Sequence, residues 1–355
     1  MPGRVYTLKC GSSEGVLARE SASDTSREAD ANLLTIPPGG KCVCGMKSSY
    51  SPLARLAACL LMTGVAVIAP GCAKKSGETN TAASASSAAT APGEQRYPLT
   101  GEIVAVNSDR GTLSVTHDEI KGFMMAMTME FKVAKGDLEN AKVGQHIRAE
   151  LVRRGNDLSL EKIWPNDTVT TSAVTAATKA LAQDTVMRGQ GAYREIGETL
   201  PEFTLLDQTG KTVAGSRFRG KQVVLNFIYT RCPIATMCPA ATLKMMALQK
   251  AAHDAGVKDL ELVSITLDPE HDTPGVLKDY AEVRGIDTSN FTFLTGPDAA
   301  VRQLLAQLGV IREFEGATIK HSLSTILINE AGKIAYRQDG SAWKVDGFME
   351  HLKRG

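Results

Sequence analysis

Two cysteines that directly follow an apolar run constrain the fold of this chain more than any other feature. Residues 223–229 read VVLNFIY, and the segment RCPIATMCP follows at residues 231–239. A short apolar run bounded by turn residues is typical of a strand buried on both faces of a sheet. Cys232 and Cys238 are therefore expected at the edge of a sheet, where a buried strand ends.

The remainder of residues 196–355 alternates strand patterns with helix patterns. Thr273 and Pro274 have the positions of a helix N-cap and a first helical residue. This alternation predicts an α/β layer with a mixed sheet, and a dithiol between strand and helix is typical of a thioredoxin-like core. Strands are expected at 223–229, 260–267, 291–294, 322–329 and 333–338, and helices at 241–255, 273–285, 298–308 and 343–352.

The chemistry of the dithiol depends on a third residue, His321, which precedes the apolar run 323–328. Two thiols and an imidazole can bind Cu(I), and two thiols alone can exchange a disulfide. A helix beginning after Cys238 is expected to lower the thiol pKa values. The alternatives are a purely stabilising Cys232–Cys238 disulfide and a histidine that only packs.

Residues 97–165 have the pattern of a small all-β domain. Short segments with alternating polar and apolar residues are separated by turns that contain glycine. Five such strands predict a small closed barrel of the OB type. The expected strands are 101–106, 112–117, 131–133, 146–152 and 158–163.

A methionine-rich segment, FMMAMTMEF at residues 123–131, lies within this small domain and follows His117. On a strand, Met127 and Met129 point to the same face. Two thioethers and an imidazole would form a neutral site that suits Cu(I) or Ag(I) and is poor for hard ions. The alternative is that the methionines fill the domain's core.

The N-terminal part is predicted to be a targeting sequence. Residues 46–72 contain a basic region and an apolar run at 56–70, which is shorter than the roughly 20 residues of a membrane span. This segment ends in APGC, which resembles a bacterial lipobox, so Cys72 is the predicted lipid attachment site. An uncleaved anchor and a plain secretory signal are the alternatives.

Three further segments are not expected to form domains. Residues 1–45 are polar, lack periodicity and do not fit before a signal peptide, so we hypothesise that Met46 is the true start. Residues 73–96 are rich in alanine, serine and threonine and predict a flexible tether. Residues 166–195 are expected to be partly helical and mainly a linker.

Charge and cysteine usage argue against two classes of protein, namely nucleic-acid-binding proteins and disulfide-stapled folds. The formal net charge is +1, which gives no argument for a nucleic-acid partner. Five of the seven cysteines lie in the first 72 residues, so the remaining chain cannot be a disulfide-stapled fold.

Residues 196–355 resemble the Sco/SenC family of thioredoxin-fold copper proteins. The resemblance rests on FRGK at 218–221, NFIYTRCP at 226–233, CP at 238–239, DPEHDTP at 268–274 and HS at 321–322. It implies that Cys232, Cys238 and His321 bind copper. It also implies delivery to the binuclear copper centre of cytochrome c oxidase, or reduction of that centre's cysteines. The family usually has three residues between its cysteines, whereas this chain has five and lacks the acidic residue often found there.

Residues 97–165 resemble the CusF-like periplasmic copper-binding domains. The resemblance rests on a histidine and a Met-Thr-Met unit, and it implies that His117, Met127 and Met129 hold Cu(I). Those domains often have a tryptophan three residues before the first methionine ligand. Met124 occupies that position here, as an extra ligand or as packing.

Together these features predict a multidomain, exported and lipid-anchored copper metallochaperone of the periplasm. It would comprise a small all-β, OB-like barrel, a linker and an α/β thioredoxin-like domain. Its cargo would be Cu(I), with Cu(II) left open, and its partner a copper-centre subunit of cytochrome c oxidase or another periplasmic copper or thiol client. One alternative is a thiol-disulfide oxidoreductase in which Cys232 attacks and Cys238 resolves. Another is a copper-tolerance buffer without a client.

Overall fold

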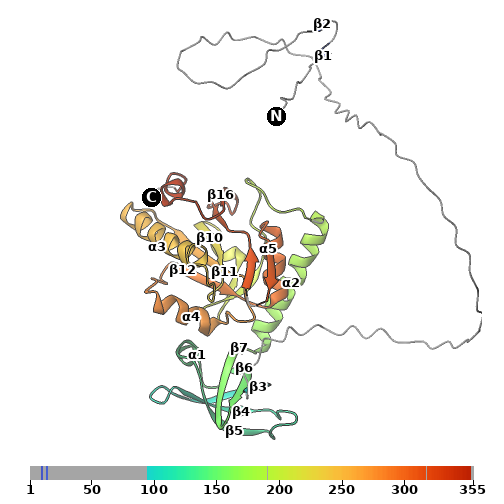
Figure 1. Ribbon diagram of the computed structural model, residues 1–355, viewed down its shortest axis with the longest axis vertical. Coiled ribbons are helices and arrows are strands. Elements are labelled where there is room, and N and C mark those ends of the chain that lie inside the picture. The colour runs from blue at the N-terminus through green and yellow to red at the C-terminus, as the bar shows by residue number, and fades with distance from the viewer. Residues whose placement is uncertain (1–8, 11–12, 15–93, 190, 317, 353–355) are drawn as a thin grey trace, which may run out of the picture. The chain divides into compact units, whose positions relative to one another are not determined.

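The computed structural model describes residues 9–10, 13–14, 94–189, 191–316 and 318–352 (Figure 1). Near the N-terminus, β1 (Lys9–Cys10) pairs with β2 (Ser13–Glu14) in an antiparallel arrangement. The predicted signal peptide, the lipid site at Cys72 and nearly all of the tether lie outside the described residues. Within the described ranges, no helix has the length and apolarity needed to cross a bilayer.

The first domain is rich in strands, as predicted. Its strands pair in the ring order β3-β4-β5-β7-β6, but β5 and β7 are joined by a single pair, Lys132 with Ser159. The ring is therefore uneven, and the OB type stays a prediction. Its elements are β3 (Glu94–Asn107), β4 (Thr112–His117), β5 (Met127–Lys132), α1 (Lys135–Asn140), β6 (His146–Arg154) and β7 (Asp157–Pro165).

The second domain is built on a seven-stranded mixed sheet in the order β16-β15-β10-β11-β12-β8-β9. Strands β10, β11 and β12 are parallel, and β15 runs antiparallel to β10. The strands are β8 (Thr204–Asp207), β9 (Thr212–Ala214), β10 (Gln222–Ile228), β11 (Leu260–Thr266), β12 (Phe291–Thr295), β15 (Ser324–Ile328) and β16 (Ile334–Asp339). The predicted α/β layer with a mixed sheet is confirmed.

Helices cover both faces of this sheet, with α3 and α4 on one face and α2 and α5 on the other (Figure 1). A separate hairpin, β13 with β14, lies outside the main sheet. The bounds are α3 (Cys238–Asp254), α4 (Pro274–Val283), α5 (Asp298–Gln307), α6 (Val345–Met349), the 3₁₀ helix η1 (Gly215–Phe218), β13 (Arg312–Glu315) and β14 (Thr318–His321).

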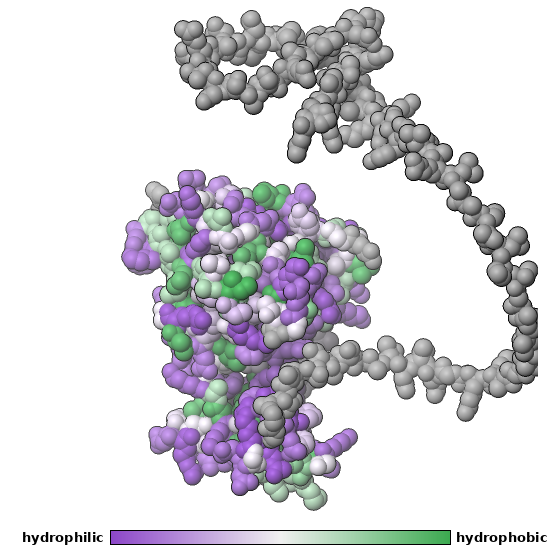
Figure 2. All heavy atoms as spheres, viewed as in Figure 1, coloured by the Kyte–Doolittle hydropathy of each residue, from purple (hydrophilic) through white to green (hydrophobic). Residues whose placement is uncertain are grey.

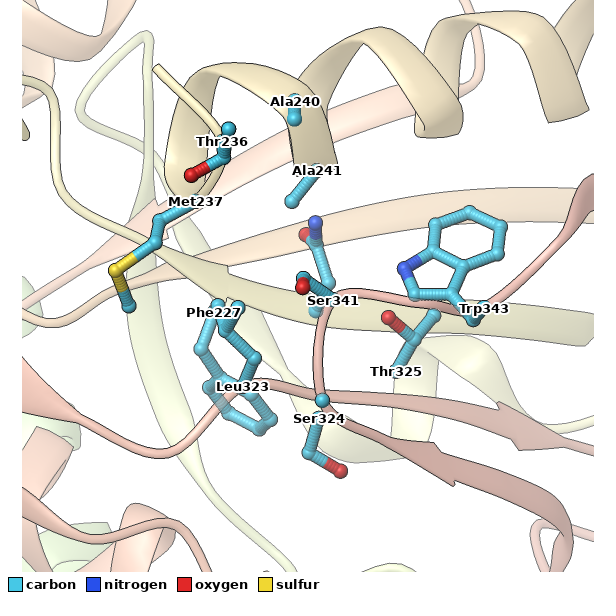
Figure 3. Close-up of a pocket in the computed structure, with 12 residues that line it drawn as sticks. Phe227, Thr236, Met237, Ala240, Ala241, Leu323, Ser324, Thr325, Ser341 and Trp343 are labelled. Atoms are coloured by element: carbon cyan, nitrogen blue, oxygen red, sulfur yellow. The ribbon is translucent and has the colours of Figure 1, made fainter. Parts of the chain in front are cut away.

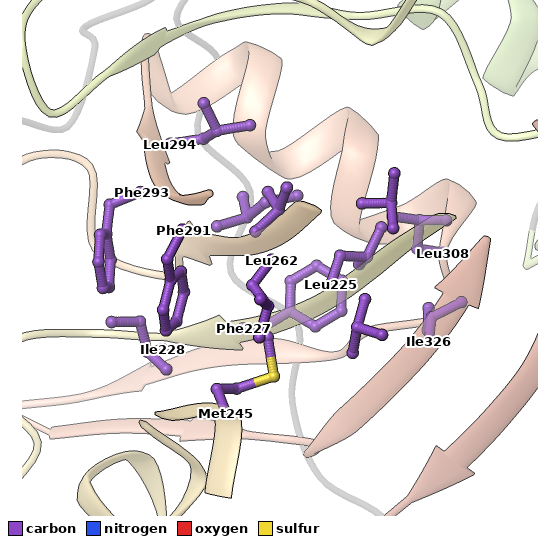
Figure 4. Close-up of a cluster of buried hydrophobic side chains, with 14 of the residues drawn as sticks. Leu225, Phe227, Ile228, Met245, Leu262, Phe291, Phe293, Leu294, Leu308 and Ile326 are labelled. Carbon is purple, nitrogen blue, oxygen red and sulfur yellow. The ribbon is translucent and has the colours of Figure 1, made fainter. Parts of the chain in front are cut away.

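The core of the second domain lies between the central strands and these helices (Figure 4). Every residue of β10 is buried, and Phe227 packs among side chains from β11, β12 and α3. The rings of Phe291 and Phe293 stack with their centroids 4.8 Å apart. Each buried side chain of this size contributes roughly 1.5–3 kcal/mol to folding, so the end of β10 is held in a rigid frame.

The segment 166–195, predicted to be mainly a linker, contains the 21-residue helix α2 (Thr168–Arg188). Asp167 caps it by accepting a hydrogen bond from the Thr170 amide at 2.8 Å. Val174 and Leu181 are its buried residues. Two buried apolar residues in such a long helix leave a weak periodic pattern, which explains why the sequence indicated only partly helical structure over this stretch.

Helix α1 packs against α4 within the second of the two compact units into which the chain divides. Ion pairs join Lys135 to Glu282 at 2.8 Å and Lys278 to Glu139 at 2.9 Å. The backbones approach closely at Gly275, where an added Cβ would clash with the buried carboxylate of Asp137. Burial, and then the charge of Asp279, raises the pKa of Asp137 to about 7.

The surface has the character expected of domains that face water. On the face shown in Figure 2, hydrophilic residues predominate and hydrophobic residues form scattered groups. Single exposed apolar side chains are normal on soluble domains, so this face alone suggests no site.

Candidate metal centres

The two cysteines lie where β10 gives way to α3, as predicted. Cys238 is the first residue of α3 and is fully buried, whereas Cys232 is half-exposed in the loop before it. Both are free thiols. The Cys232 amide donates a 3.3 Å hydrogen bond to the Tyr229 carbonyl, which holds the loop against the end of the strand.

His321, the last residue of β14, brings an imidazole to Cys238. Its Nε2 lies 3.6 Å from Cys238 Sγ. Its Nδ1 lies 3.1 Å from the Ser322 carbonyl, so a proton on Nδ1 would donate to that oxygen and leave the Nε2 lone pair facing the sulfur. Burial lowers the pKa of His321, which favours the neutral imidazole that binds metals.

The electrostatics of Cys238 correct one expectation. The start of α3 was expected to lower the pKa of the thiols, but burial raises the pKa of Cys238 well above its ordinary value. The loss of hydration outweighs the helix terminus because the side chain is fully buried. Without a metal, Cys238 is therefore held as a thiol.

The three predicted ligands, Cys232, Cys238 and His321, do not form a preassembled metal site. Cys238 and His321 converge, and Cys232 contacts the Ile234 carbonyl at 3.9 Å. In the described part of the chain, no three histidine, cysteine, aspartate or glutamate side chains are grouped closely enough to hold a metal ion.

Two aspartates that our sequence analysis did not place in the site brace the cysteine loop. Asp272 is buried and accepts hydrogen bonds from the Thr230 amide at 3.1 Å and from the Thr266 hydroxyl at 2.6 Å. Asp268 is also buried and accepts from Arg231 Nε at 2.6 Å. The acidic residues of DPEHDTP were the available signal, but only the folded structure reveals their partners.

The segment DPEHDTP also leads into a helix, as predicted. Helix α4 begins at Pro274, and the Thr273 side chain caps it by accepting from the Val276 amide. The same short segment therefore starts α4 and supports the loop that carries Cys232.

A pocket lies beside the cysteine loop on the side of α3 and β15 (Figure 3). Met237 and Trp343 lie at opposite ends of it. Asn226 Nδ2 and Ser324 Oγ are buried there and have no hydrogen-bond partner among the described residues. The pocket therefore has the polarity to hold a water molecule, but neither Cys232 nor His321 lines it.

The second candidate centre lies in the β domain. His117 pairs directly with Met127 across β4 and β5, and Met129 follows two residues later. Directly paired residues and residues two apart share one face of a sheet, so the three predicted ligands project to the same side.

The His117 side chain is oriented as a ligand would be. It is 2% exposed, and its Nδ1 lies 2.7 Å from the Asp118 carbonyl. Its Nε2 is buried without a hydrogen-bond partner among the described residues. An unpaired buried imidazole nitrogen costs free energy unless something binds it, and two neighbouring thioethers favour a soft metal in that place.

The methionine and aromatic residues beside His117 differ in their burial. Met127 is 46% exposed, whereas Met129 is partly buried against the domain's core. Met124 also packs against that core. Phe123 stacks on Tyr97 with ring centroids 4.4 Å apart. Met124 and Met129 therefore both contribute to the packing of this core.

Comparisons with known proteins agree with this geometry. Residues 192–354 match the family model of SCO1/SenC, and residues 96–165 match that of CusF, described as a copper binding periplasmic protein. The CusF match confirms copper as the predicted metal. The family descriptions do not specify its oxidation state.

Individual relatives cover less than half of this chain. A SCO1 homologue of Bacillus subtilis is 29% identical over 43% of this chain and 79% of its own length. A SCO2-like protein of Rickettsia typhi is 31% identical over 44% of this chain and 77% of its own length. The crystal structure of a SCO1/SenC family lipoprotein from Bacillus anthracis is 28% identical and matches 45% of this chain and 96% of that chain, with a TM-score of 0.41. This chain belongs to the SCO1/SenC family and carries a CusF domain ahead of its thioredoxin-like domain.

Proposed function

We propose that this chain is a periplasmic copper metallochaperone that binds Cu(I) and delivers it for assembly of the copper centre of cytochrome c oxidase. Its β domain, of the OB type, would carry Cu(I) on His117, Met127 and Met129. Its thioredoxin-like domain would carry Cu(I) on Cys232, Cys238 and His321. A lipid on Cys72 would hold the protein at the membrane.

One observation carries this proposal: the 3.6 Å approach of His321 Nε2 to Cys238 Sγ. A buried, neutral imidazole beside a thiol matches the preference of Cu(I) for nitrogen and sulfur donors. Because burial raises the pKa of Cys238, binding a cation there would release its proton. The site would therefore change from a neutral thiol to a metal thiolate on loading.

Delivery would proceed by ligand exchange. Cys232 is half-exposed and Cys238 is buried, so a client thiolate would reach the metal from the side of Cys232. Cys232 would be the first ligand replaced, and Cys238 with His321 would be the last. The β domain would load this site, because two sites on one chain raise the effective concentration for transfer.

A second function, thiol-disulfide exchange, is favoured by the same difference in exposure. An accessible thiol that attacks and a buried thiol that resolves are the arrangement an oxidoreductase needs. Cys232 and Cys238 fit those roles by position. This function does not need the imidazole of His321, whereas copper binding does.

Copper stoichiometry of the reduced full-length chain tests the proposal. We expect one copper fewer in Cys232→Ser, and one fewer in the double variant Met127→Leu/Met129→Leu. Met125→Leu is the matched control, because Met125 is 78% exposed. If Cys232→Ser kept all its copper, the thioredoxin-like domain would not be a copper carrier and the exchange function would remain.

Delivery and internal loading need separate measurements. Copper transfer from the loaded chain to a purified, reduced copper-centre domain of the oxidase would support delivery, and failure to transfer would count against it. Deleting residues 97–165 should slow copper loading of Cys232 and Cys238 at limiting copper. Unchanged loading would show that the β domain is a separate store.

A further inference from the structure

The β domain and the thioredoxin-like domain are joined by very little chain. Strand β7 ends at Pro165 and α2 begins at Thr168, so only residues 166–167 lie between them. Helix α2 belongs to the thioredoxin-like domain, because the buried Gln307 of α5 donates a hydrogen bond to the Thr185 hydroxyl at 3.1 Å. Residues 166–167 are therefore the covalent hinge between the two domains.

Side-chain contacts also cross from one domain to the other. Trp164 of β7 packs beside the hinge with Val174 and Leu206. Helix α1 packs on α4, and Asn140 at the end of α1 donates a 2.9 Å hydrogen bond to the Gln208 carbonyl. Because α1 has only six residues, its helical form depends on these contacts rather than on its own hydrogen bonds.

The contact between α1 and α4 is built on two glycines, Gly136 and Gly275. An added Cβ at Gly136 would clash with the Gly275 carbonyl oxygen, and one at Gly275 would clash with the Asp137 carboxylate. Glycine permits a backbone approach that any side chain at the same position would prevent. The close packing of α1 on α4 therefore depends on the lack of a side chain at both positions.

This contact also brings two aspartates together. Asp137 is 6% exposed, and the half-buried Asp279 lies beside Gly136, where an added Cβ would be 3.0 Å from the Asp279 carboxyl carbon. Neither aspartate is ion-paired among the described residues. The lysines and glutamates of the contact pair with one another across it: Lys135 with Glu282, and Lys278 with Glu139. An ionised Asp137 would therefore face Asp279 without a cation of its own.

We propose that the α1–α4 contact is a clasp that holds the β domain on the thioredoxin-like domain while Asp137 is protonated, and that it opens about residues 166–167 when Asp137 ionises. Opening would change the separation between the candidate centres of His117 and Cys238. The clasp needs no copper at either centre, so it does not rest on the proposed function.

The direction of the pH dependence follows from the burial of Asp137. Burial, and then the charge of Asp279, raises the pKa of Asp137 from 3.8 to about 7. In the open form water reaches the carboxyl, and its pKa returns toward the ordinary value. Between these two values the closed form binds more protons than the open form. The closed form therefore loses stability as pH rises through this window, and the loss is complete above pH 7.

Hydrogen exchange of the copper-free, full-length chain at pH 5 and pH 8 tests the clasp, with uptake read by mass spectrometry. Labelling times are scaled for the intrinsic effect of pH, so that the comparison reports protection. We expect the amides of α1 to be about tenfold less protected at pH 8 than at pH 5. Asp137→Asn should keep α1 equally protected at both. Asp157→Asn is the matched control and should keep the pH dependence, because the Asp157 side chain is 75% exposed.

A glycine variant tests the geometry without any change of charge. Gly275→Ala should lower the protection of α1 at pH 5 by about tenfold, because the methyl group holds the helices apart. Gly347→Ala is the matched control, since its Cβ would lie 3.5 Å from the Tyr336 hydroxyl, which is an ordinary contact. The amides of β4 and β10 should stay protected in both variants, because each domain remains folded.

Small-angle X-ray scattering measures the separation of the domains. The radius of gyration of the unmodified chain should be larger at pH 8 than at pH 5, and that of Asp137→Asn should be the same at both. A loss of α1 protection without this change would mean that α1 only frays, and would overturn the hinge motion.

Three results of the exchange experiment would also overturn the proposal. The first is equal α1 protection at pH 5 in Gly275→Ala and the unmodified chain. The second is the same pH dependence in Asp137→Asn and the unmodified chain. The third is a loss of protection that extends to β4 and β10, since the domains would then unfold rather than separate. All samples are free of copper, so these results are distinct from the copper stoichiometry that tests the proposed function.

Discussion

The sulfur of Cys238 lies 3.6 Å from Nε2 of His321, although 83 positions separate the two residues. The sheet register explains this approach. Strands β10 and β15 are antiparallel neighbours, and Asn226 pairs with Thr325. The end of β10 therefore lies beside the start of β15, and the chain segments that carry Cys238 and His321 meet at one edge of the sheet.

We predict that His321→Ala lowers the copper content of the reduced chain by one ion and leaves thiol exchange at Cys232 nearly unchanged. The imidazole is one of three proposed soft donors, whereas disulfide exchange needs only the sulfurs. Copper analysis and reaction with a disulfide reagent measure the two properties. His253→Ala is the control, because the His253 side chain is 89% exposed. Full copper content in His321→Ala would remove this residue from the site.

The buried nitrogen of His117 leads to a prediction about stability. In a Cys232→Ser background, excess Cu(I) should raise the melting temperature of the β domain, because a ligand that binds only the folded state stabilises it by about 2.7 kcal/mol at one hundred times its Kd. His117→Leu should abolish this rise. Without copper it should cost no more than about 1 kcal/mol, because it removes an unpaired buried nitrogen together with one hydrogen bond to the Asp118 carbonyl.

Calorimetry with and without Cu(I) measures this effect. His146→Leu in the same domain is the control, since its side chain is 61% exposed, and it should keep the rise. A copper-dependent rise that survives His117→Leu would mean that the methionines bind the metal without the imidazole.

The features predictable from sequence were those with strong local patterns. The run 223–229 predicted β10, and the pair Thr273 and Pro274 predicted the start of α4. Helix α2 and the full extent of β5 were not predictable in this way. Only Val174 and Leu181 of α2 are buried, and β5 starts at Met127 with exposed residues.

In the candidate site, too, some features could be predicted from the sequence and others depend on tertiary packing. Residue chemistry alone suggested Cys232, Cys238 and His321. The bracing by Asp272 and the raised pKa of Cys238 depend on tertiary burial. Neither the burial of a helix terminus nor the partner of a carboxylate is encoded in a local pattern.

The bracing carboxylate gives a prediction about folding. Asp272→Ala should destabilise the thioredoxin-like domain by about 3 kcal/mol, because it leaves the Thr230 amide and the Thr266 hydroxyl without their acceptor in a buried place. Urea unfolding measures the loss. Asp254→Ala is the control, because the Asp254 side chain is 56% exposed and pairs only with its neighbours on the surface. A loss under 1 kcal/mol in Asp272→Ala would show that the loop does not depend on this carboxylate.

The buried carboxyl of Asp137 makes stability depend on pH. Its pKa is raised from 3.8 to about 7, first by burial and then by Asp279. Between these two values the folded state binds more protons than the unfolded state, so stability falls as pH rises through this window and the full penalty is present above pH 7. Asp137→Asn removes the ionisation.

The amide variant should therefore be more stable than the unmodified chain at pH 8, by on the order of 2 kcal/mol, given about 1.4 kcal/mol per unit of pKa shift and partial access of water. The difference should shrink at pH 5, where the carboxyl is mostly protonated in the folded protein. Urea unfolding at both pH values measures it, with Asp157→Asn as the control because that side chain is 75% exposed. Parallel pH profiles for the unmodified chain and Asp137→Asn would mean that this carboxyl is hydrated, and that α1 does not bury it against α4.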